Sequence, residues 1–351
     1  MKKVVVGLSG GVDSSTAAFI LKQQGYQVIG ITLKLSEVDQ CSLDKQVCCS
    51  TKDILDAKKV ASFLGIPHYV IDWQDIFKEK VIDYFIREYQ SGYTPNPCSI
   101  CNREVKTGLL AKYAKKVLKA DFFATGHYIK TDFLDGEKVI KRGVDTSKDQ
   151  SYFMALVEKE VIDMLIFPLG DFTKEEVRKI AYENKIPVSQ KSESFEICFT
   201  AGKTPEEYFK SLGIPLKIGD IVHVSGKVLG KHKGLEAYTI GQRKGLGIRW
   251  KEPLYVIDKD PIKNTIIVGE KEHLLTDTVV AKNFNFLVPM EKWKNIQVQG
   301  RYRQKPIEVR DFHYDGELLK ITFKEKQQKM APGQILAVYQ DDTLLGGGVI
   351  I

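Results

Sequence analysis

A glycine- and serine-rich segment near the N-terminus has the residue types that bind phosphate. It reads Gly7-Leu8-Ser9-Gly10-Gly11-Val12-Asp13-Ser14-Ser15 and joins an apolar run to a segment with helical spacing. Glycines let the backbone approach phosphate oxygens, and a helix N-terminus offers N–H groups and a favourable dipole. Ser9 and Ser14 add hydroxyl donors, while Asp13 is a candidate Mg²⁺ ligand or helix cap. The spacing matches neither the Walker loop nor the dinucleotide-binding fingerprint, so we expect a different kind of phosphate loop.

Three of the six cysteines lie in segments that favour reactivity. Cys98 and Cys101 lie between Thr94 and Lys106, where two prolines stiffen the chain and a helix is expected from Asn102. The positive end of a helix lowers the pKa of a nearby thiol, which makes Cys101 a candidate nucleophile. Cys198 lies in a polar-to-apolar loop. One Cys-x-x-Cys without a second pair does not predict a four-thiolate zinc site.

The elements that must position these residues alternate between strand and helix over the first 130 residues. Expected strands are Val4–Leu8, Gln27–Leu33, His68–Ile71 and Phe122–Thr125, and expected helices are Ser14–Gln24, Asp53–Leu64 and Asn102–Lys119. Short apolar strands that alternate with helices predict a doubly wound parallel sheet.

Beyond this region the expected secondary structure changes twice, first to a hairpin followed by helices and then to short β-strands. Residues 128–143 alternate around Asp135-Gly136, which predicts a type I′ hairpin. Thr173 and Glu176 form a capping box for a helix to Asn184, and Pro205–Leu212 is a further short helix. After Gly213, β-rich runs predict a small module and then a barrel. These runs are Asp220–Val224, Glu236–Thr239, Tyr255–Asp258, Thr265–Gly269, Thr278–Phe286, Ile296–Tyr302, Ile307–Phe312, Leu318–Phe323 and Ile335–Tyr339. We expect domains at 1–205, 206–276 and 277–351.

Charge is distributed unevenly along the chain. Residues 1–210 contain 30 basic and 29 acidic side chains, whereas residues 211–351 contain 22 and 16, so the excess lies in the second part. Such a surplus suits contact with a polyanion, although a solvated basic surface would look the same. No apolar run approaches the length of a membrane span, and the apolar start is too short for a signal peptide. We expect a cytoplasmic protein with no membrane and no DNA partner.

The loop resembles the PP-loop of ATP pyrophosphatases, and further motifs extend the resemblance to nearly the whole chain. They include residues 94–106, Ala124-Thr125-Gly126-His127-Tyr128, residues 148–153, Ile197-Cys198-Phe199, residues 239–247, residues 301–304 and residues 331–334. In these the chain is similar to the MnmA-type tRNA-specific 2-thiouridylases. The resemblance implies an α/β PP-loop domain, then a small β-rich tRNA-binding module and a C-terminal β-barrel.

The resemblance also implies an activity and a set of site residues. The activity would be 2-thiolation of uridine 34 in the anticodon stem-loop of tRNAs for Lys, Glu and Gln, with ATP converted to AMP and pyrophosphate and Mg²⁺ expected. Cys198 would carry a persulfide from a sulfur-relay protein or cysteine desulfurase, and Cys101 would form a disulfide with it. The implied ATP site comprises Gly7, Leu8, Ser9, Gly10, Gly11, Val12, Asp13, Ser14, Leu33 and Gly126. The implied tRNA contacts are Asn96, Pro97, Cys98, His127, Lys148, Asp149, Gln150, Arg301, Tyr302 and Gln334.

Several alternatives stay open at this point. Many members of the family carry Asp where this chain has Cys98, so Cys98, Cys101 and Cys198 could instead hold a [4Fe–4S] cluster that delivers sulfide. An ATP pyrophosphatase acting on a small molecule would explain the loop but not the paired cysteines. An RNA-binding protein with a degenerate nucleotide fold is disfavoured by the intact Ser-Gly-Gly-Val-Asp-Ser. The roles of Cys41, Cys48 and Cys49 are undecided.

Overall fold

The N-terminal part of the computed structural model contains a five-stranded parallel sheet. The structure describes residues 1–35, 51–192 and 197–351, so Cys41, Cys48 and Cys49 lie outside the described residues. The strand order is β3-β2-β1-β4-β7, and each neighbouring pair is parallel. The strands are β1 (Lys3–Gly7), β2 (Gln27–Lys34), β3 (His68–Asp72), β4 (Phe122–Ala124) and β7 (Leu165–Ile166). The apolar runs of the sequence form the central strands, as buried parallel strands require.

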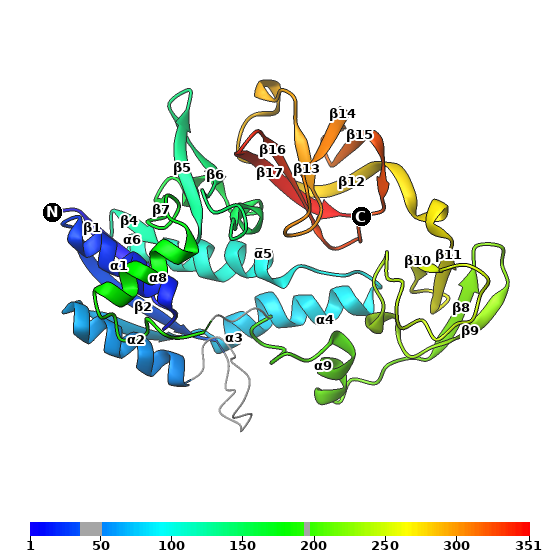
Figure 1. Ribbon diagram of the computed structural model, residues 1–351, viewed down its shortest axis with the longest axis horizontal. Coiled ribbons are helices and arrows are strands. Elements are labelled where there is room, and N and C mark those ends of the chain that lie inside the picture. The colour runs from blue at the N-terminus through cyan, green and yellow to red at the C-terminus, as the bar shows by residue number, and fades with distance from the viewer. Residues whose placement is uncertain (36–50, 193–196) are drawn as a thin grey trace.

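Helices cover both faces of this sheet, which confirms the doubly wound prediction. Alternate side chains of β1 point to opposite faces, so Val4 and Val6 pack with α1 and α2, whereas Val5 packs toward Cys101. One face is covered by α1 (Val12–Gln23), α2 (Thr51–Leu64) and α8 (Lys174–Glu183). The other is covered by the helices between residues 74 and 116 (Figure 1). None of the helices in the described ranges has the length and apolar character to cross a membrane.

The helical layer beneath the second face differs from the sequence expectation. The stretch α3 (Gln74–Phe77), η1 (Lys78–Ile82) and α4 (Asp83–Gln90) was not expected. The expected helix at Asn102 begins earlier, as α5 (Pro97–Cys101), and continues through η2 (Asn102–Leu109) and α6 (Leu110–Lys116). Asn96 caps α5 by accepting from the Ser99 N–H at 3.0 Å, and Pro97 is the first helical residue. An Asn cap followed by Pro is a helix-start signal.

The expected hairpin and capping box are both present. Strands β5 (Ile129–Leu134) and β6 (Glu137–Arg142) meet at Asp135 and Gly136, whose φ values are 51° and 83°, as a type I′ turn requires. Thr173 and Glu176 form the capping box of α8. Short helices complete this part, namely η3 (Ser151–Met154), α7 (Lys159–Ile162) and α9 (Pro205–Ser211).

A four-stranded sheet forms the middle module, in the order β10-β11-β8-β9. The strands are β8 (Gly219–His223), β9 (Val228–His232), β10 (Tyr255–Asp260) and β11 (Thr265–Gly269). The expected strand at Glu236–Thr239 is wrong, because Leu235–Ala237 forms the 3₁₀ turn η4, which buries Leu235 in the module's core. Strand β9, with its single glycine, was not expected.

The C-terminal part is a β-barrel that also takes up the hairpin of the first domain. Its strands are β12 (Leu275–Phe286), β13 (Gln297–Gln299), β14 (Ile307–Tyr314), β15 (Leu318–Gln328), β16 (Ile335–Gln340) and β17 (Thr343–Ile350), with turns η5 (Lys271–Leu274) and η6 (Met290–Lys292). Pairing of β12 with both β15 and β17 closes the barrel. Strand β17 also pairs with β6, so hairpin and barrel form one sheet.

Candidate nucleotide and thiol site

The phosphate loop has a conformation that its own residues maintain. Gly10 has φ 71°, and a Cβ there would lie 2.2 Å from the carbonyl oxygen of Asp53 in α2, so only glycine fits. Gly11 is the N-cap residue of α1 in an extended conformation. The Ser9 N–H donates to Ser14 Oγ at 3.1 Å, and the two hydroxyl oxygens lie 3.1 Å apart. The loop therefore wraps the N-terminus of a twelve-residue helix, as a phosphate cradle does.

The other two positions expected at the nucleotide site lie at the carboxyl edge of the same sheet. Gly126 follows β4, and a Cβ there would lie 2.7 Å from the Ser14 nitrogen, so glycine is needed for this close approach. Leu33 is near the end of β2. Strand β1 stands between β2 and β4, where the chain changes its direction of winding, and ligands bind in such crevices.

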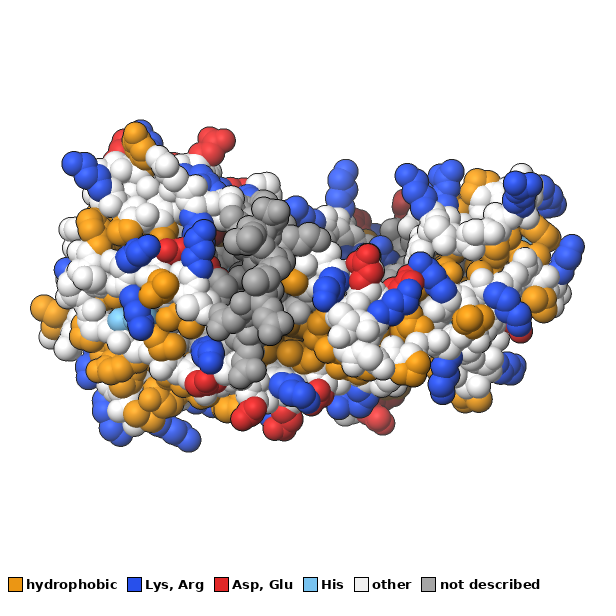
Figure 2. Space-filling model, turned by 90° about the horizontal axis from the view of Figure 1, so that it is seen from below, with side chains coloured by type: hydrophobic (Ala, Val, Ile, Leu, Met, Phe, Trp, Pro, Cys, Tyr) orange, Lys and Arg blue, Asp and Glu red, His pale blue; other side chains and the backbone are white. Residues whose placement is uncertain are grey.

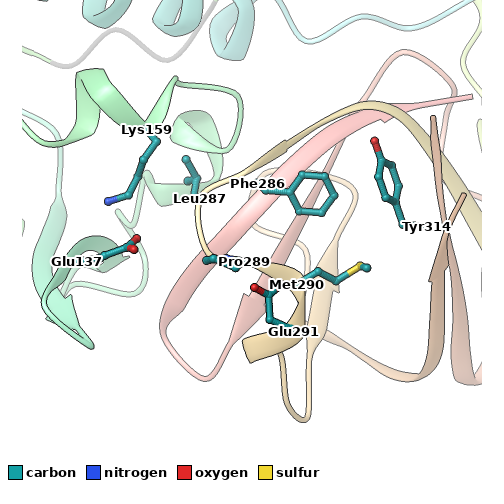
Figure 3. A pocket seen from close by; sticks show the side chains of 8 residues that line it. All are labelled: Glu137, Lys159, Phe286, Leu287, Pro289, Met290, Glu291 and Tyr314. Atoms are coloured by element: carbon teal, nitrogen blue, oxygen red, sulfur yellow. The ribbon is translucent and has the colours of Figure 1, made fainter. Parts of the chain in front are cut away.

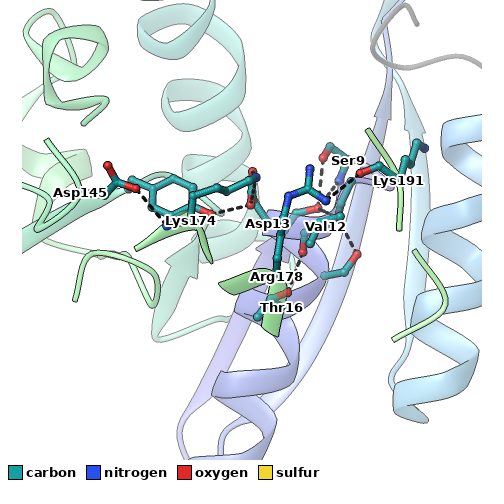
Figure 4. Close-up of polar contacts among 12 residues, drawn as sticks. Ser9, Val12, Asp13, Thr16, Asp145, Lys174, Arg178 and Lys191 are labelled. Atoms are coloured by element: carbon teal, nitrogen blue, oxygen red, sulfur yellow. Dashed lines mark hydrogen bonds and ion pairs between the residues drawn. The ribbon is translucent and has the colours of Figure 1, made fainter. Parts of the chain in front are cut away.

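Asp13 is paired with a buried cation, which the sequence did not show. Its carboxylate accepts from Lys174 Nζ at 2.6 and 2.9 Å and from the Tyr128 hydroxyl at 2.7 Å (Figure 4). The Lys174 side chain is only 10% exposed. Asp13 does not cap α1, so that expectation is wrong, and its oxygens are already engaged by Lys174 and Tyr128.

A second lysine braces the loop from the opposite side. Lys191 Nζ donates to the Gly10 carbonyl at 3.0 Å and to Asp53 and Asp56 at 2.7 Å each. Burial alone would lower the pKa of Lys191, but the two carboxylates outweigh burial and raise it. Arg178 from α8 donates to the Lys191 carbonyl at 3.3 Å and lies beside the loop (Figure 4). Spacing in the sequence gives no signal for these cations, because Lys174, Arg178 and Lys191 lie more than 150 residues from the loop.

The thiol segment places Cys98, rather than Cys101, at the helix start. Because α5 begins at Pro97, Cys98 is its second residue and is exposed, whereas Cys101 lies one turn further and is 5% exposed. The expectation that Cys101 lies at a helix N-terminus is therefore wrong. Cys101 packs in the apolar core on the second face of the sheet.

Cys198 packs against the same core as Cys101. It precedes Phe199, whose ring contacts Phe85 of α4 at 5.1 Å and Tyr208 of α9 at 5.4 Å between centroids. Burial, and then the nearby charge of Cys198, raise the pKa of Tyr208 to about 12. The structure therefore places both thiols on the face of the sheet that α4 and α5 cover.

The three thiols do not form a metal centre in the described part of the chain. Within residues 1–35, 51–192 and 197–351, no group of three His, Cys, Asp or Glu side chains is arranged to hold a metal ion. Cys98 and Cys101 are three residues apart on α5 and are therefore neighbours on the helix surface, but Cys98 is exposed whereas Cys101 is buried. In the described structure the three thiols are therefore not arranged as ligands of a [4Fe–4S] cluster.

Two expected RNA contacts in the first domain have internal roles. Asp149 is 8% exposed, forms an ion pair with Arg142 at 2.9 Å, and accepts from Ser151 Oγ at 2.8 Å. Gln150 accepts from the Tyr128 N–H at 3.1 Å. Lys148 precedes them and is half-buried.

His127 is neutral and follows Gly126, at the carboxyl edge of the parallel sheet. Burial, and then the charge of Lys106, lower the pKa of the ring to about 3. Its Nδ1 lies 2.7 Å from the Thr125 hydroxyl, and its ring packs edge-on against Phe167. A neutral ring carries no positive charge, and because Nδ1 is engaged by Thr125, Nε2 is its other hydrogen-bonding atom.

The expected contacts of the barrel lie at its junctions with the other parts. Arg301 donates to the Ile240 carbonyl of the middle module at 3.1 Å, and the Tyr302 ring lies 4.6 Å from that of Phe153. Gln334 donates to the Thr94 carbonyl at 2.7 Å. The structure thus groups these residues at interfaces between parts of the chain.

Two hollows in the surface lie apart from these residues. One, of about 580 Å³, is bounded by Arg249, Trp250 and Lys251 of the middle module. The other, of about 470 Å³, lies between the hairpin and the barrel and has an apolar floor (Figure 3). It is lined by Glu137, Lys159, Phe286, Leu287, Pro289, Met290, Glu291 and Tyr314. Neither hollow is lined by an expected site residue.

The sheet order and the loop at its carboxyl edge define a nucleotide-binding domain of the HUP class. Family models agree along the chain: a "tRNA methyl transferase HUP domain" matches residues 2–202, a "tRNA methyl transferase PRC-barrel domain" residues 209–270, and an "Aminomethyltransferase beta-barrel domain" residues 276–350. The chain belongs to the tRNA-specific 2-thiouridylase MnmA family. The resemblance found in the sequence is thereby confirmed.

Relatives of that name match over almost the full length. The chain is 64% identical to a tRNA-specific 2-thiouridylase MnmA of Persephonella marina, covering 99% of this chain and 100% of the relative. It is 51% identical to one from Aquifex aeolicus, covering 99% and 98%. A Clostridioides difficile relative is 42% identical with the same coverage of each chain.

Proposed function

We propose that the protein is a tRNA sulfurtransferase that uses ATP to replace the C2 oxygen of uridine 34, in tRNAs for Lys, Glu and Gln, with sulfur. The observation that carries this proposal is the 64% identity to a tRNA-specific 2-thiouridylase along the whole chain. The geometry supports the proposal, because the phosphate loop and the two thiols Cys101 and Cys198 are all positioned by the same parallel sheet.

ATP activates an oxygen that is otherwise a poor leaving group. The loop Gly7–Ser14 would bind the phosphates through backbone N–H groups and the Ser9 and Ser14 hydroxyls. Lys174, Arg178 and Lys191 surround this loop and would offset the charge of the departing pyrophosphate. Because Asp13 is paired with Lys174, we expect Mg²⁺ to enter with ATP as part of the substrate.

The uracil O2 would attack the α-phosphorus, form an O-adenylated uridine and release pyrophosphate. The terminal sulfur of a persulfide on Cys198 then forms the bond to C2, and AMP leaves with the oxygen. The Cys101 thiol would attack Cys198 Sγ, break the S–S bond and leave a Cys101–Cys198 disulfide. An external thiol reductant and a sulfur-relay protein or cysteine desulfurase are needed to restore the persulfide.

The charge distribution supports an RNA substrate. Lys and Arg side chains gather over the end of the molecule that carries β8–β11 (Figure 2), and Lys227, Lys231, Arg249 and Lys251 are exposed there. Such side chains bind phosphates, and their contribution weakens with salt. An anticodon base is unpaired and can leave its stack to reach a buried thiol.

The test is thiolation of transcribed tRNA for Lys with ATP, cysteine, a cysteine desulfurase and a reductant, followed by mass spectrometry of nucleosides. We expect 2-thiouridine that is absent when uridine 34 is changed to cytidine. Cys198→Ser and Cys101→Ser should each abolish the product, whereas Cys98→Ser, which removes the other thiol of α5, should keep it if the persulfide route holds.

The outcomes separate the alternatives. Thiolation that persists in Cys198→Ser would contradict the role of this thiol. Loss of product in Cys98→Ser together with bound iron would favour the cluster route. Pyrophosphate release at full rate without tRNA would indicate a small-molecule substrate.

A further inference from the structure

The short segment that precedes the thiol helix is held by both other parts of the molecule. We call Gly92–Pro95 the strap, and it runs from α4 back to α5 beneath the barrel (Figure 1). A Cβ on Gly92 would lie 3.6 Å from Pro261 of the middle module, and Lys282 of the barrel lies over the Tyr93 ring at 5.9 Å. The strap therefore contacts the turn between β10 and β11 and also β12.

The barrel satisfies both backbone polar groups of Thr94. The Thr94 N–H donates to the Pro332 carbonyl at 2.8 Å, and Gln334 Nε2 donates to the Thr94 carbonyl at 2.7 Å. Gly333 lies between them with φ 90°, and a Cβ there would lie 3.0 Å from Tyr93 and 3.1 Å from Thr94. The loop 331–334 therefore lies directly against the strap, and position 333 has space for a hydrogen atom but not for a side chain.

A second connection runs parallel to the first. Tyr152 donates from its hydroxyl to the Ile335 carbonyl at 3.0 Å, next to Gln334. The Asn96 side chain interacts with the same hydroxyl, and Asn96 is the residue that caps α5. Residues 334 and 335 of the barrel are therefore linked to residues 94 and 96 of the thiol segment.

The chain between the strap and the thiols transmits position because it is stiff. Pro95 and Pro97 fix φ on both sides of Asn96, so a displaced Thr94 carries the first turn of α5 with it. That turn contains Cys98, and Cys101 follows on the next.

We propose that Gln334 is a positioning residue for the thiol site, and that its amide couples RNA bound on the barrel to the position of α5. This inference depends on the proposed function only in one respect, namely that the molecule bound on the barrel is RNA. The Thr94 carbonyl needs a donor, which assigns Nε2 to that contact. Within the described residues Oε1 accepts no hydrogen bond, and Gln334 is partly exposed, so Oε1 can accept from an RNA hydroxyl or base N–H.

The first test compares Gln334→Met with Gln340→Met by amide hydrogen exchange, without RNA or ATP. Gln340 ends the strand that Gln334 precedes, and its Oε1 accepts from the Lys294 N–H at 2.8 Å, so each variant loses one side-chain hydrogen bond to the backbone. Loss of one such bond should speed exchange at Thr94 and in the first turn of α5 by about tenfold in Gln334→Met. Exchange there should be unchanged in Gln340→Met.

Gly333→Ala is a second variant that keeps the glutamine. Its Cβ would push on Tyr93 and Thr94, so exchange at the strap should rise as in Gln334→Met. Equal exchange at Thr94 in the wild type and both variants would overturn the inference. Because no RNA or ATP is present, this result stands whether or not the protein thiolates tRNA.

The second test separates positioning from binding. In Gln334→Met the rate constant for 2-thiouridine formation at saturating tRNA should fall about tenfold, while KM for ATP stays the same. Added tRNA should slow exchange at Thr94 in the wild type and have a smaller effect in the variant. A changed KM for tRNA with an unchanged rate constant and no tRNA-dependent protection would show that Gln334 only binds RNA, which would overturn the coupling.

Discussion

The phosphate loop and the thiol segment lie in one domain but are held in place by different means. The loop is closed by its own hydroxyls, and Gly10 rests on α2, only about 40 residues away in sequence. The thiol segment is set by Asn96 locally, but its strap depends on Pro261 and Gln334, which belong to the other two parts of the chain.

The difference shows where each activity can be controlled. If the protein has the proposed function, a loop that is complete within its own domain should bind ATP with little dependence on the barrel. The thiol helix α5, whose preceding strap contacts the barrel, should instead respond to movement of the barrel. We infer that nucleotide binding is the more robust of the two and that sulfur transfer depends on the assembled molecule.

The largest effect on this comparison should come from Arg142→Leu. Arg142 forms an ion pair with Asp149, donates to Gln299 of the barrel at 2.8 Å, and lies 3.8 Å over the Tyr339 ring. Leaving Asp149 buried and unpaired should lower the free energy of unfolding by about 3–5 kcal/mol. Denaturant unfolding measures this, and ATP affinity of the folded variant should be unchanged.

The matched control is Arg310→Leu in β14, at an exposed position. A surface change of this kind should alter stability by less than about 0.5 kcal/mol. If Arg142→Leu weakened ATP binding as much as it weakened the barrel, the two sites would not be independent.

Gly10→Ala should break the phosphate loop and spare the thiol segment. The new Cβ would lie 2.2 Å from the Asp53 carbonyl oxygen at φ 71°, so the loop must open. We expect a loss of about 2 kcal/mol or more in the free energy of unfolding, and ATP binding weakened more than about tenfold by calorimetry.

Gly25→Ala separates clash from backbone strain. Gly25 has φ 82°, but nothing lies within 4 Å of a Cβ there. It should lose only about 1 kcal/mol and keep its ATP affinity. Equal losses in the two variants would mean that contact with Asp53 is unimportant for the loop.

The smallest effect concerns His127 and pH. The folded ring has a pKa of about 3, so the unfolded chain takes up a proton near pH 6.5 that the folded chain does not. Stability should therefore fall as pH decreases below 6.5, and less steeply in His127→Gln. Thermal unfolding at pH 5 and pH 8 measures the slope, and an unchanged slope in the variant would contradict a neutral ring.

The sequence predicted the sheet, the hairpin and the phosphate loop because these depend on local patterns. Apolar runs, Asp135-Gly136 and the Gly-Gly pair each act within a few residues. The helices at 74–90 and strand β17 escaped prediction for a shared reason. The Tyr and Phe residues of the helices at 74–90, and Gly346–Gly348 of β17, fit their positions because of the distant residues that pack against them. No local sequence pattern reports such packing.

The candidate site was predictable to the same extent. Leu33 and Gly126 were expected near the loop through family resemblance, and Gly126 lies against it. Lys174 and Lys191 were not expected, because a single lysine in the sequence carries no signal until its carboxylate partner is known. Asp149 and Gln150 were expected at an RNA surface, but their side chains bond within the protein.

Because β6 pairs with β17, the hairpin cannot complete its sheet until the end of the chain has been synthesised. Lys141 and Ile140 pair with Thr343 and Leu344, about 200 residues later in the chain. At roughly 5–20 residues per second, the hairpin waits on the order of 10–40 s for its partner strand. During that time β6 presents an unpaired edge, which favours association with other chains. A chaperone that shields this edge on the ribosome would therefore raise the yield of folded protein.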